Sequence, residues 1–115
     1  MTYALLIYRT LAPSLPASNA DGLAGHRALQ AEASAAHELH AVAQLAPPVT
    51  ARAVRAHGNA HEVTDGPFVE SKEWLVGFYL IDCESEEQAL ARAKQICPHE
   101  DHAVEVRPVA WRWRP

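Results

Sequence analysis

Histidine and carboxylate side chains are the groups in this sequence most able to do chemistry. The chain contains 7 histidines and 14 acidic residues. Imidazole can take up and release protons near neutral pH, and it is also a common metal ligand. One histidine, His26, stands alone, and the other six form three close pairs: His37 and His40, His57 and His61, and His99 and His102.

The three histidine pairs have spacings that could suit zinc, copper or nickel. One pair spans a predicted helix-to-strand junction, one flanks a hairpin turn, and one lies in a loop. None has the single helical face that an HExxH zinc site provides, and no cysteine stands at zinc-finger spacing. We therefore expect no structural metal, and we assign no cofactor.

Asp65 lies in the segment 64–68, whose sequence is TDGPF. In a structural interpretation, Asp65 caps a turn, Gly66 supplies a permissive backbone conformation before Pro67, and Phe68 anchors the loop. In a functional interpretation, Asp65 is a carboxylate held on a rigid turn beside a pocket. Spacing alone favours the structural interpretation without excluding the other.

The elements that position these residues follow from hydrophobic patterning. Apolar residues at helical spacing predict a helix over 21–36, and His26 falls on the border of the stripe formed by Leu23, Leu29 and Ala33. Ser85 with Gln88 three residues later is a capping box, and it predicts a second helix that ends before Pro98. Main strands are expected at 2–9, 38–45, 75–83 and 102–109, with a minor hairpin between 50 and 64 around a turn at 57–59.

This order predicts an α+β fold of the ferredoxin-like β-α-β-β-α-β kind with an antiparallel sheet. Right-handed crossovers place the first and third main strands in the middle and both helices on one face. These two strands are continuously apolar, which predicts burial on both faces. A second copy of the sheet is the simplest cover for the face without helices, so we expect a homodimer through that face.

Composition limits the remaining classes of function. A chain of 115 residues suits one domain. The formal net charge is −4, and the only basic cluster is Arg112 with Arg114, so nucleic acid is not expected as a partner. The first apolar run is far shorter than a membrane span, and Cys83 and Cys97 fall at opposite ends of one helix. We expect two free thiols and a cytoplasmic protein without membrane contact.

Several segments together resemble one protein family. The stretch 63–73, which contains the DGPF motif, runs into Leu75, Gly77, Phe78 and Tyr79, and further matches lie at 3–8, 26–29, 45–48 and 104–109. This pattern resembles the DGPF branch of the YCII-related family over nearly the whole chain. The sequence departs from the usual pattern at His37 and Val76, and in the tail from Trp111 to Pro115.

The resemblance implies a dimeric ferredoxin-like α/β barrel with a pocket between the first helix and the sheet. In related YCII proteins a histidine of that helix, working with an aspartate, is the proposed acid/base pair, and one branch includes a dehydrochlorinating enzyme. His26 matches the histidine. The aspartate has no clean counterpart, because His37 and His40 occupy that region, and we take Asp65 in its place.

The predicted site therefore has His26 and Asp65 as catalytic residues, with Phe68, Tyr8 and His40 lining the ligand pocket. The predicted function is that of a small-molecule-binding protein of unknown ligand. Its alternatives are an enzyme that uses histidine acid/base chemistry and a non-catalytic binding or accessory module, with a purely structural dimer as a third reading. Trp111 and Trp113 are predicted to pack at the subunit interface.

Overall fold

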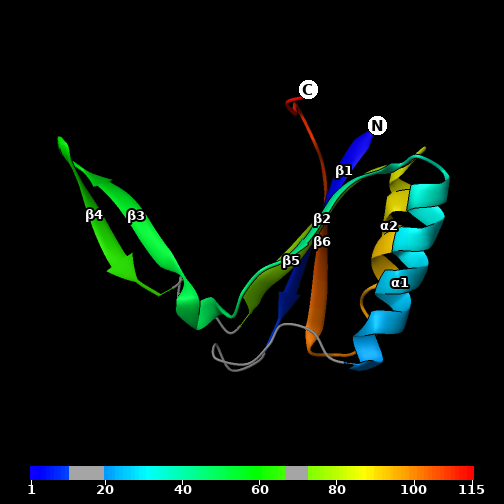
Figure 1. The fold of residues 1–115 in the computed structure, drawn as a ribbon, viewed down its shortest axis with the longest axis horizontal. Coiled ribbons are helices and arrows are strands. Elements are labelled where there is room, and N and C mark those ends of the chain that lie inside the picture. Colours follow the sequence, from blue (N-terminus) through cyan, green and yellow to red (C-terminus); the bar gives the residue numbers. More distant parts are fainter. Residues whose placement is uncertain (11–19, 67–72) are drawn as a thin grey trace.

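The computed structural model describes residues 1–10, 20–66 and 73–115. Within these ranges the fold is α+β: two α-helices lie on one face of a four-stranded antiparallel sheet, and a two-stranded hairpin extends from it (Figure 1). The elements are β1 (Thr2–Arg9), α1 (Ala20–Ala35), β2 (Leu39–Gln44), the 3₁₀ turn η1 (Pro48–Thr50), β3 (Arg52–His57), β4 (Ala60–Asp65), β5 (Trp74–Asp82), α2 (Glu86–Gln95) and β6 (His102–Pro108).

The strands of the main sheet lie in the order β2-β5-β1-β6. The two continuously apolar strands, β1 and β5, are thus central, as the sequence predicts. Leu5 of β1 pairs with Tyr79 of β5 on one side and with Val106 of β6 on the other. Because paired residues in an antiparallel sheet point to the same face, these three side chains share one side of it.

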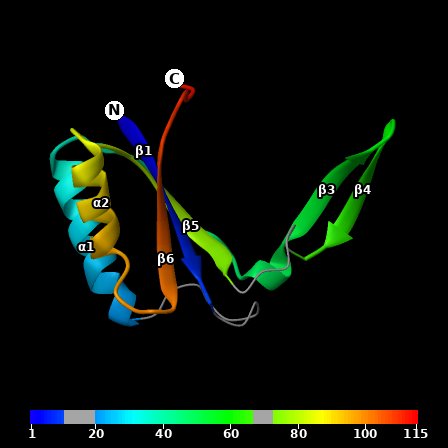
Figure 2. The same cartoon turned by 180° about the vertical axis from the view of Figure 1, so that it is seen from behind.

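That side carries the hydrophobic core. Burial alternates along β1, where Tyr3, Leu5 and Ile7 are buried and their neighbours are less covered. The buried strand residues form one core cluster with residues of both helices, which lie side by side along this face of the sheet (Figure 2). Fully buried apolar side chains of this size each stabilise a fold by roughly 1.5–3 kcal/mol relative to exposure. The helices contribute Leu29 and Ala33 of α1 and Ala89 and Ala93 of α2 to this core, together with Ile96 directly after α2.

The Ser85 cap predicted for α2 is present, and the return bond of the capping box is displaced by one residue to Glu84. The backbone N–H of Gln88 donates to the Ser85 hydroxyl at 3.2 Å, and the Gln88 side-chain oxygen accepts from the backbone N–H of Glu84 at 2.7 Å. Arg92 then ties α2 to the rest of the layer by donating to Glu32 of α1 at 2.6 Å and to Glu38 at 3.4 Å. These contacts fix the helices over the sheet.

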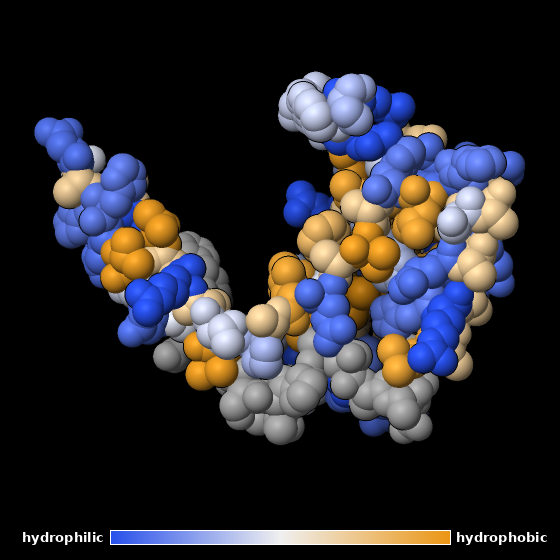
Figure 3. All heavy atoms as spheres, viewed as in Figure 1, coloured by the Kyte–Doolittle hydropathy of each residue, from blue (hydrophilic) through white to orange (hydrophobic). Residues whose placement is uncertain are grey.

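The other side of the sheet, which we call the open face, consists of Ala4, Leu6 and Tyr8 of β1 with Phe78 and Leu80 of β5 and their β2 neighbours Ala41 and Ala43. The sequence predicts burial on both faces, whereas these side chains are only partly covered within one chain. The reason is that both helices lie on the opposite face. On this side of the molecule, apolar side chains border a hollow (Figure 3).

Strands β3 and β4 form the predicted hairpin, which we call the arm. They pair from Arg52 with Asp65 to His57 with Ala60, and Gly58 adopts a positive φ of 62° in the turn. The arm projects away from the main sheet (Figure 1). The radius of gyration is 15.6 Å, whereas a compact chain of this length would have roughly 13 Å. The extended arm accounts for this difference.

Candidate functional site

His26 lies on the face of α1 that turns toward the sheet. Its Nδ1 is 2.7 Å from the hydroxyl oxygen of Tyr79, and the two rings are nearly parallel, at 9°, with centroids 5.8 Å apart. Gln30, one turn further along α1, donates its side-chain N–H to the same hydroxyl at 3.1 Å. Tyr79 is fully buried, so its hydroxyl is a fixed point between the two helix side chains.

The Tyr79 hydroxyl can both donate and accept a hydrogen bond, so the tautomer of His26 decides the proton positions in this cluster. In the tautomer with the ring proton on Nε2, the Tyr79 hydroxyl accepts from Gln30 and donates to His26 Nδ1. Nδ1 is then occupied as an acceptor, and Nε2 remains as a donor.

Burial sets the protonation of both rings. Burial lowers the pKa of His26, and the charge of nearby His102 lowers it further. Burial raises the pKa of Tyr79, although the hydrogen bond from Gln30 works against this shift. Near neutral pH the site therefore consists of a neutral imidazole beside a neutral phenol. Such a pair can donate a hydrogen bond to a ligand oxygen and can pass a proton.

His102 belongs to a second polar group, which it forms with Asp101 and Arg9. The His102 Nδ1 is 2.9 Å from one oxygen of Asp101, and the other oxygen accepts from Arg9 at 2.8 Å. Burial lowers the pKa of His102, with Arg9 adding to the shift and Asp101 opposing it. The Arg9 hydrogen bond holds the pKa of Asp101 below its usual range. Strand pairing of Arg9 with His102 brings this group together.

The structure places the remaining predicted site residues apart from His26. Asp65 ends β4 on the arm, is exposed, and has its carboxylate 3.5 Å from Arg52 Nε. The arm and α1 lie on opposite sides of the main sheet (Figure 1), so one chain does not bring Asp65 to His26. Tyr8 lies on the open face, and Phe68 falls outside the described residues.

His40 lies in a different cluster, where it meets a carboxylate that the sequence reasoning missed. Its Nε2 is 2.8 Å from one oxygen of Asp82, and the other oxygen accepts from the Thr2 hydroxyl at 2.6 Å. The Thr2 hydrogen bond is the largest cause that lowers the pKa of Asp82, and the contact with His40 lowers it further. Arg112 donates to His40 Nδ1 at 3.0 Å. His40 thus bridges an anion and a cation.

Little in the sequence predicts the contacts that Asp82 and Asp101 make with histidines. Asp82 meets His40 at the point where the pairing of β2 with β5 has an irregularity, between Leu39 and Ala41. Hydrophobic periodicity cannot predict such a register shift, because the shift depends on how the two strands pack against each other. The direct neighbours Asp101 and His102 were the one local hint, at the start of a strand.

The described ranges contain no group of three or more His, Cys, Asp or Glu side chains that could hold a metal ion. His57 and Glu62 are 3.9 Å apart on the exposed arm, and the rings of His99 and His102 have centroids 5.9 Å apart. Both cysteines are free thiols. Across the same ranges, no helix is long and apolar enough to cross a membrane.

Comparison with known proteins finds a matching domain and a similar protein of known sequence. The YCII-related domain matches residues 1–114. The chain is also similar to an uncharacterized protein of Rhizobium meliloti (strain 1021), with 41% identity over 85 residues that cover 72% of this chain and 68% of that protein. The match of the domain over almost the full length shows that this chain belongs to the YCII-related family.

Proposed function

We propose that this chain binds a small molecule beside α1 and that His26 carries out acid/base chemistry on it with Tyr79 as its partner. The observation that supports the proposal is the hydrogen-bonded series Gln30, Tyr79 and His26, in which the Tyr79 hydroxyl lies within hydrogen-bond distance of both helix side chains. A half-buried histidine of lowered pKa is neutral near pH 7, so its ring has one N–H that can be donated and one nitrogen that can accept a proton.

In this proposal His26 carries its proton on Nε2, and this proton is the one that the ligand receives. If Nε2 gives this proton to a ligand oxygen, Nδ1 can accept the hydroxyl proton of Tyr79, and the imidazole stays neutral throughout. Gln30 then donates to the resulting phenolate. Because the pKa of Tyr79 is raised, this transfer suits a ligand oxygen that becomes strongly basic during the reaction. Tyr79 takes the place that an aspartate has in related proteins.

A non-catalytic binding module is the second candidate, and one observation favours it. The raised pKa of Tyr79 keeps the hydroxyl proton in place, so that His26 can act only as a hydrogen-bond donor. In this case the same residues orient a ligand without proton transfer. Both candidates predict that a ligand binds, and only the first predicts that it is turned over.

The test follows the His26 ring signals by NMR during addition of a panel of small phenols, carboxylic acids and chlorinated compounds, with chloride release measured in parallel. We expect saturable shifts of the His26 ring signals, and these should weaken in Tyr79→Phe, which removes the hydrogen-bond partner of Nδ1. His61→Ala, which removes an exposed histidine of the arm, should retain them. Chloride release that falls about 10² to 10⁴-fold in His26→Ala supports catalysis. Binding without turnover supports the second candidate, and the absence of both contradicts the proposal.

The proposal includes membership of the DGPF branch and a homodimer built like a ferredoxin-like α/β barrel. The motif at 65–68 and its flanks support the branch, and the positive φ of 91° at Gly66 gives a reason for glycine in the motif. The apolar open face supports the dimer, because monomers rarely expose continuous apolar surface beyond a few hundred Å². In such a dimer, Asp65 could approach a His26 only from a partner chain's arm.

A further inference from the structure

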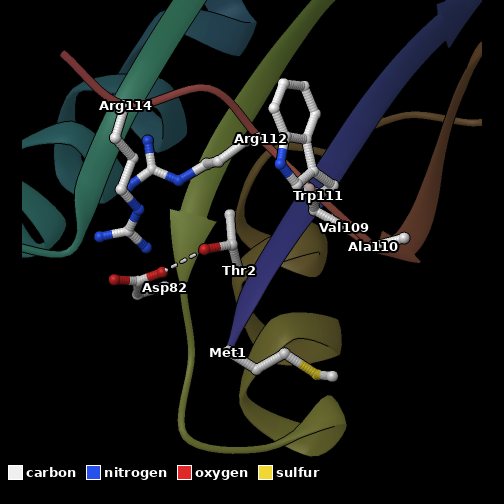
Figure 4. Close-up of a pocket in the computed structure, with 8 residues that line it drawn as sticks. All are labelled: Met1, Thr2, Asp82, Val109, Ala110, Trp111, Arg112 and Arg114. Carbon is white, nitrogen blue, oxygen red and sulfur yellow. Dashed lines mark hydrogen bonds between the residues drawn. The ribbon is translucent and has the colours of Figure 1, made fainter.

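A pocket of about 370 Å³ lies at the end of the sheet where the chain termini meet (Figure 4). Eight residues line it: Met1, Thr2, Asp82, Val109, Ala110, Trp111, Arg112 and Arg114. The volume falls within the usual range of small-molecule sites. None of these residues belongs to the His26 cluster.

The residues after β6 form the wall of this pocket. The backbone N–H of Val109 donates to the Thr2 carbonyl at 2.9 Å, which continues the pairing with β1 for one more residue. The tail then crosses β1 and β5 to reach β2, where Arg112 contacts His40. Thr2 and Asp82 alternate with the core residues Tyr3 and Ile81, so the pocket and the helices are on opposite faces of the sheet.

The charged side chains that line this pocket are mostly positive. Figure 4 shows the guanidinium groups of Arg112 and Arg114 turned toward the same side, near Asp82. Both oxygens of Asp82 are already engaged, one by Thr2 and one by His40. Within the described residues, neither guanidinium has a carboxylate within 4.0 Å, and Arg112 Nε is buried without a hydrogen-bond partner. The pocket thus holds two guanidinium charges and one carboxylate whose oxygens are already engaged, in a chain whose net charge is −4.

We propose that this pocket binds the anionic group of a small molecule, a carboxylate or a phosphate, through Arg112 and Arg114. The planar guanidinium group offers paired N–H donors that fit the oxygens of both anions. The network from Thr2 through Asp82 and His40 holds Arg112 in place, and Arg114 is the more exposed partner. The indole of Trp111, which is 79% exposed, can cover an apolar part of the ligand.

The probes for this proposal are inorganic phosphate and benzoate, added separately to the intact protein. Binding is followed through the indole N–H signals of the three tryptophans, assigned with single Trp→Phe variants. We expect a saturable shift at Trp111 with at least one probe and none at Trp74, which lies in β5 outside the pocket lining. The stronger probe identifies the anion class. Added sodium chloride should weaken the binding because it screens charge.

Two variants make the test specific. Arg114→Gln should lower the affinity roughly 10-fold, because it removes one charged donor pair from the anion without touching the tail's contact to His40. Arg27→Gln, the same change at an exposed position of α1, should leave the affinity unchanged. The proposal is overturned if neither probe gives a saturable Trp111 shift, or if Arg114→Gln binds as tightly as the unaltered protein.

Discussion

His26 takes its protonation state from its neighbours in the fold. The hydroxyl of Tyr79 occupies Nδ1, burial disfavours the charged ring, and His102 adds a repulsive charge. A carboxylate in direct contact would have the opposite effect and raise the pKa. The direction of the shift therefore distinguishes a histidine paired with tyrosine from one paired with aspartate.

This gives the first prediction. In an NMR titration, the His26 ring should have a pKa below the ordinary value of 6.5. Tyr79→Phe should move that pKa upward, because the variant removes the hydroxyl proton that favours the neutral ring. Asp65→Asn should leave it unchanged, since Asp65 contacts Arg52 on the arm. A His26 pKa that falls on replacement of Asp65 would restore the pairing predicted from the sequence.

The second prediction concerns stability in mild acid. His26 and His102 both have a pKa below 6.5 in the folded chain. The unfolded chain therefore binds more protons as the pH falls below 6.5, and the free energy of unfolding should decrease there until the folded-state pKa values are passed. The shifted carboxylates Asp82 and Asp101 have pKa values below 3.8, so their contribution is lost only at lower pH.

Urea unfolding at about pH 7.5 and about pH 5 measures this decrease. His26→Gln should make it smaller because one titrating group is removed. His61→Gln, at an exposed position on the arm, is the control and should keep the decrease of the unaltered protein. Equal stability at the two pH values would contradict the prediction.

The contact between the two helices depends on a glycine. A Cβ atom at Gly25 of α1 would overlap the backbone carbonyl oxygen of Gln95 in α2. Backbone atoms cannot yield as the end of a flexible side chain can, so the helices would have to separate. His26 is the next residue, and the same close approach therefore sets how His26 is presented to the sheet.

The third prediction follows from this contact. Gly25→Ala should lower the free energy of unfolding by about 1–3 kcal/mol, since overpacking outweighs the gain in helix propensity that alanine brings. It should also shift the His26 ring signals in NMR. Arg27→Ala, at an exposed position of the same helix, should change neither quantity appreciably. A stabilised Gly25→Ala protein would show that α1 and α2 can move apart freely.

The elements show how far the sequence alone could predict this protein. Ser85 and Gln88 fix the start of α2 by local chemistry, and the apolar runs of β1 and β5 identify the central strands. These signals are local, so periodicity and capping rules suffice. The contact of His40 with Asp82 lies where the strand register is irregular, and that of His26 with Tyr79 depends on how α1 settles on the sheet. Such long-range contacts were not predictable from spacing.

At the scale of the whole molecule, the single chain leaves apolar side chains partly covered on the open face and exposed on the arm. The open face shows Leu6, Phe78 and Leu80, and the arm has the exposed pair Val54 and Val63. An isolated two-stranded hairpin is at best marginally stable in water. A second chain packed on the open face would cover that surface, and the arm of each chain could then contact the other chain. The extended shape of the single chain agrees with this arrangement.

The last prediction tests this assembly. By light scattering at micromolar concentration, the protein should have twice the mass of one chain. Leu80→Glu should give a folded monomer, because Leu80 lies between Ala4 and Ala41 on the open face and a buried, unpaired carboxylate would oppose association. Leu90→Glu, at an exposed position on α2, should remain dimeric. Circular dichroism checks that both variants are folded. A monomeric unaltered protein, or a dimeric Leu80→Glu, would exclude the open face as the interface.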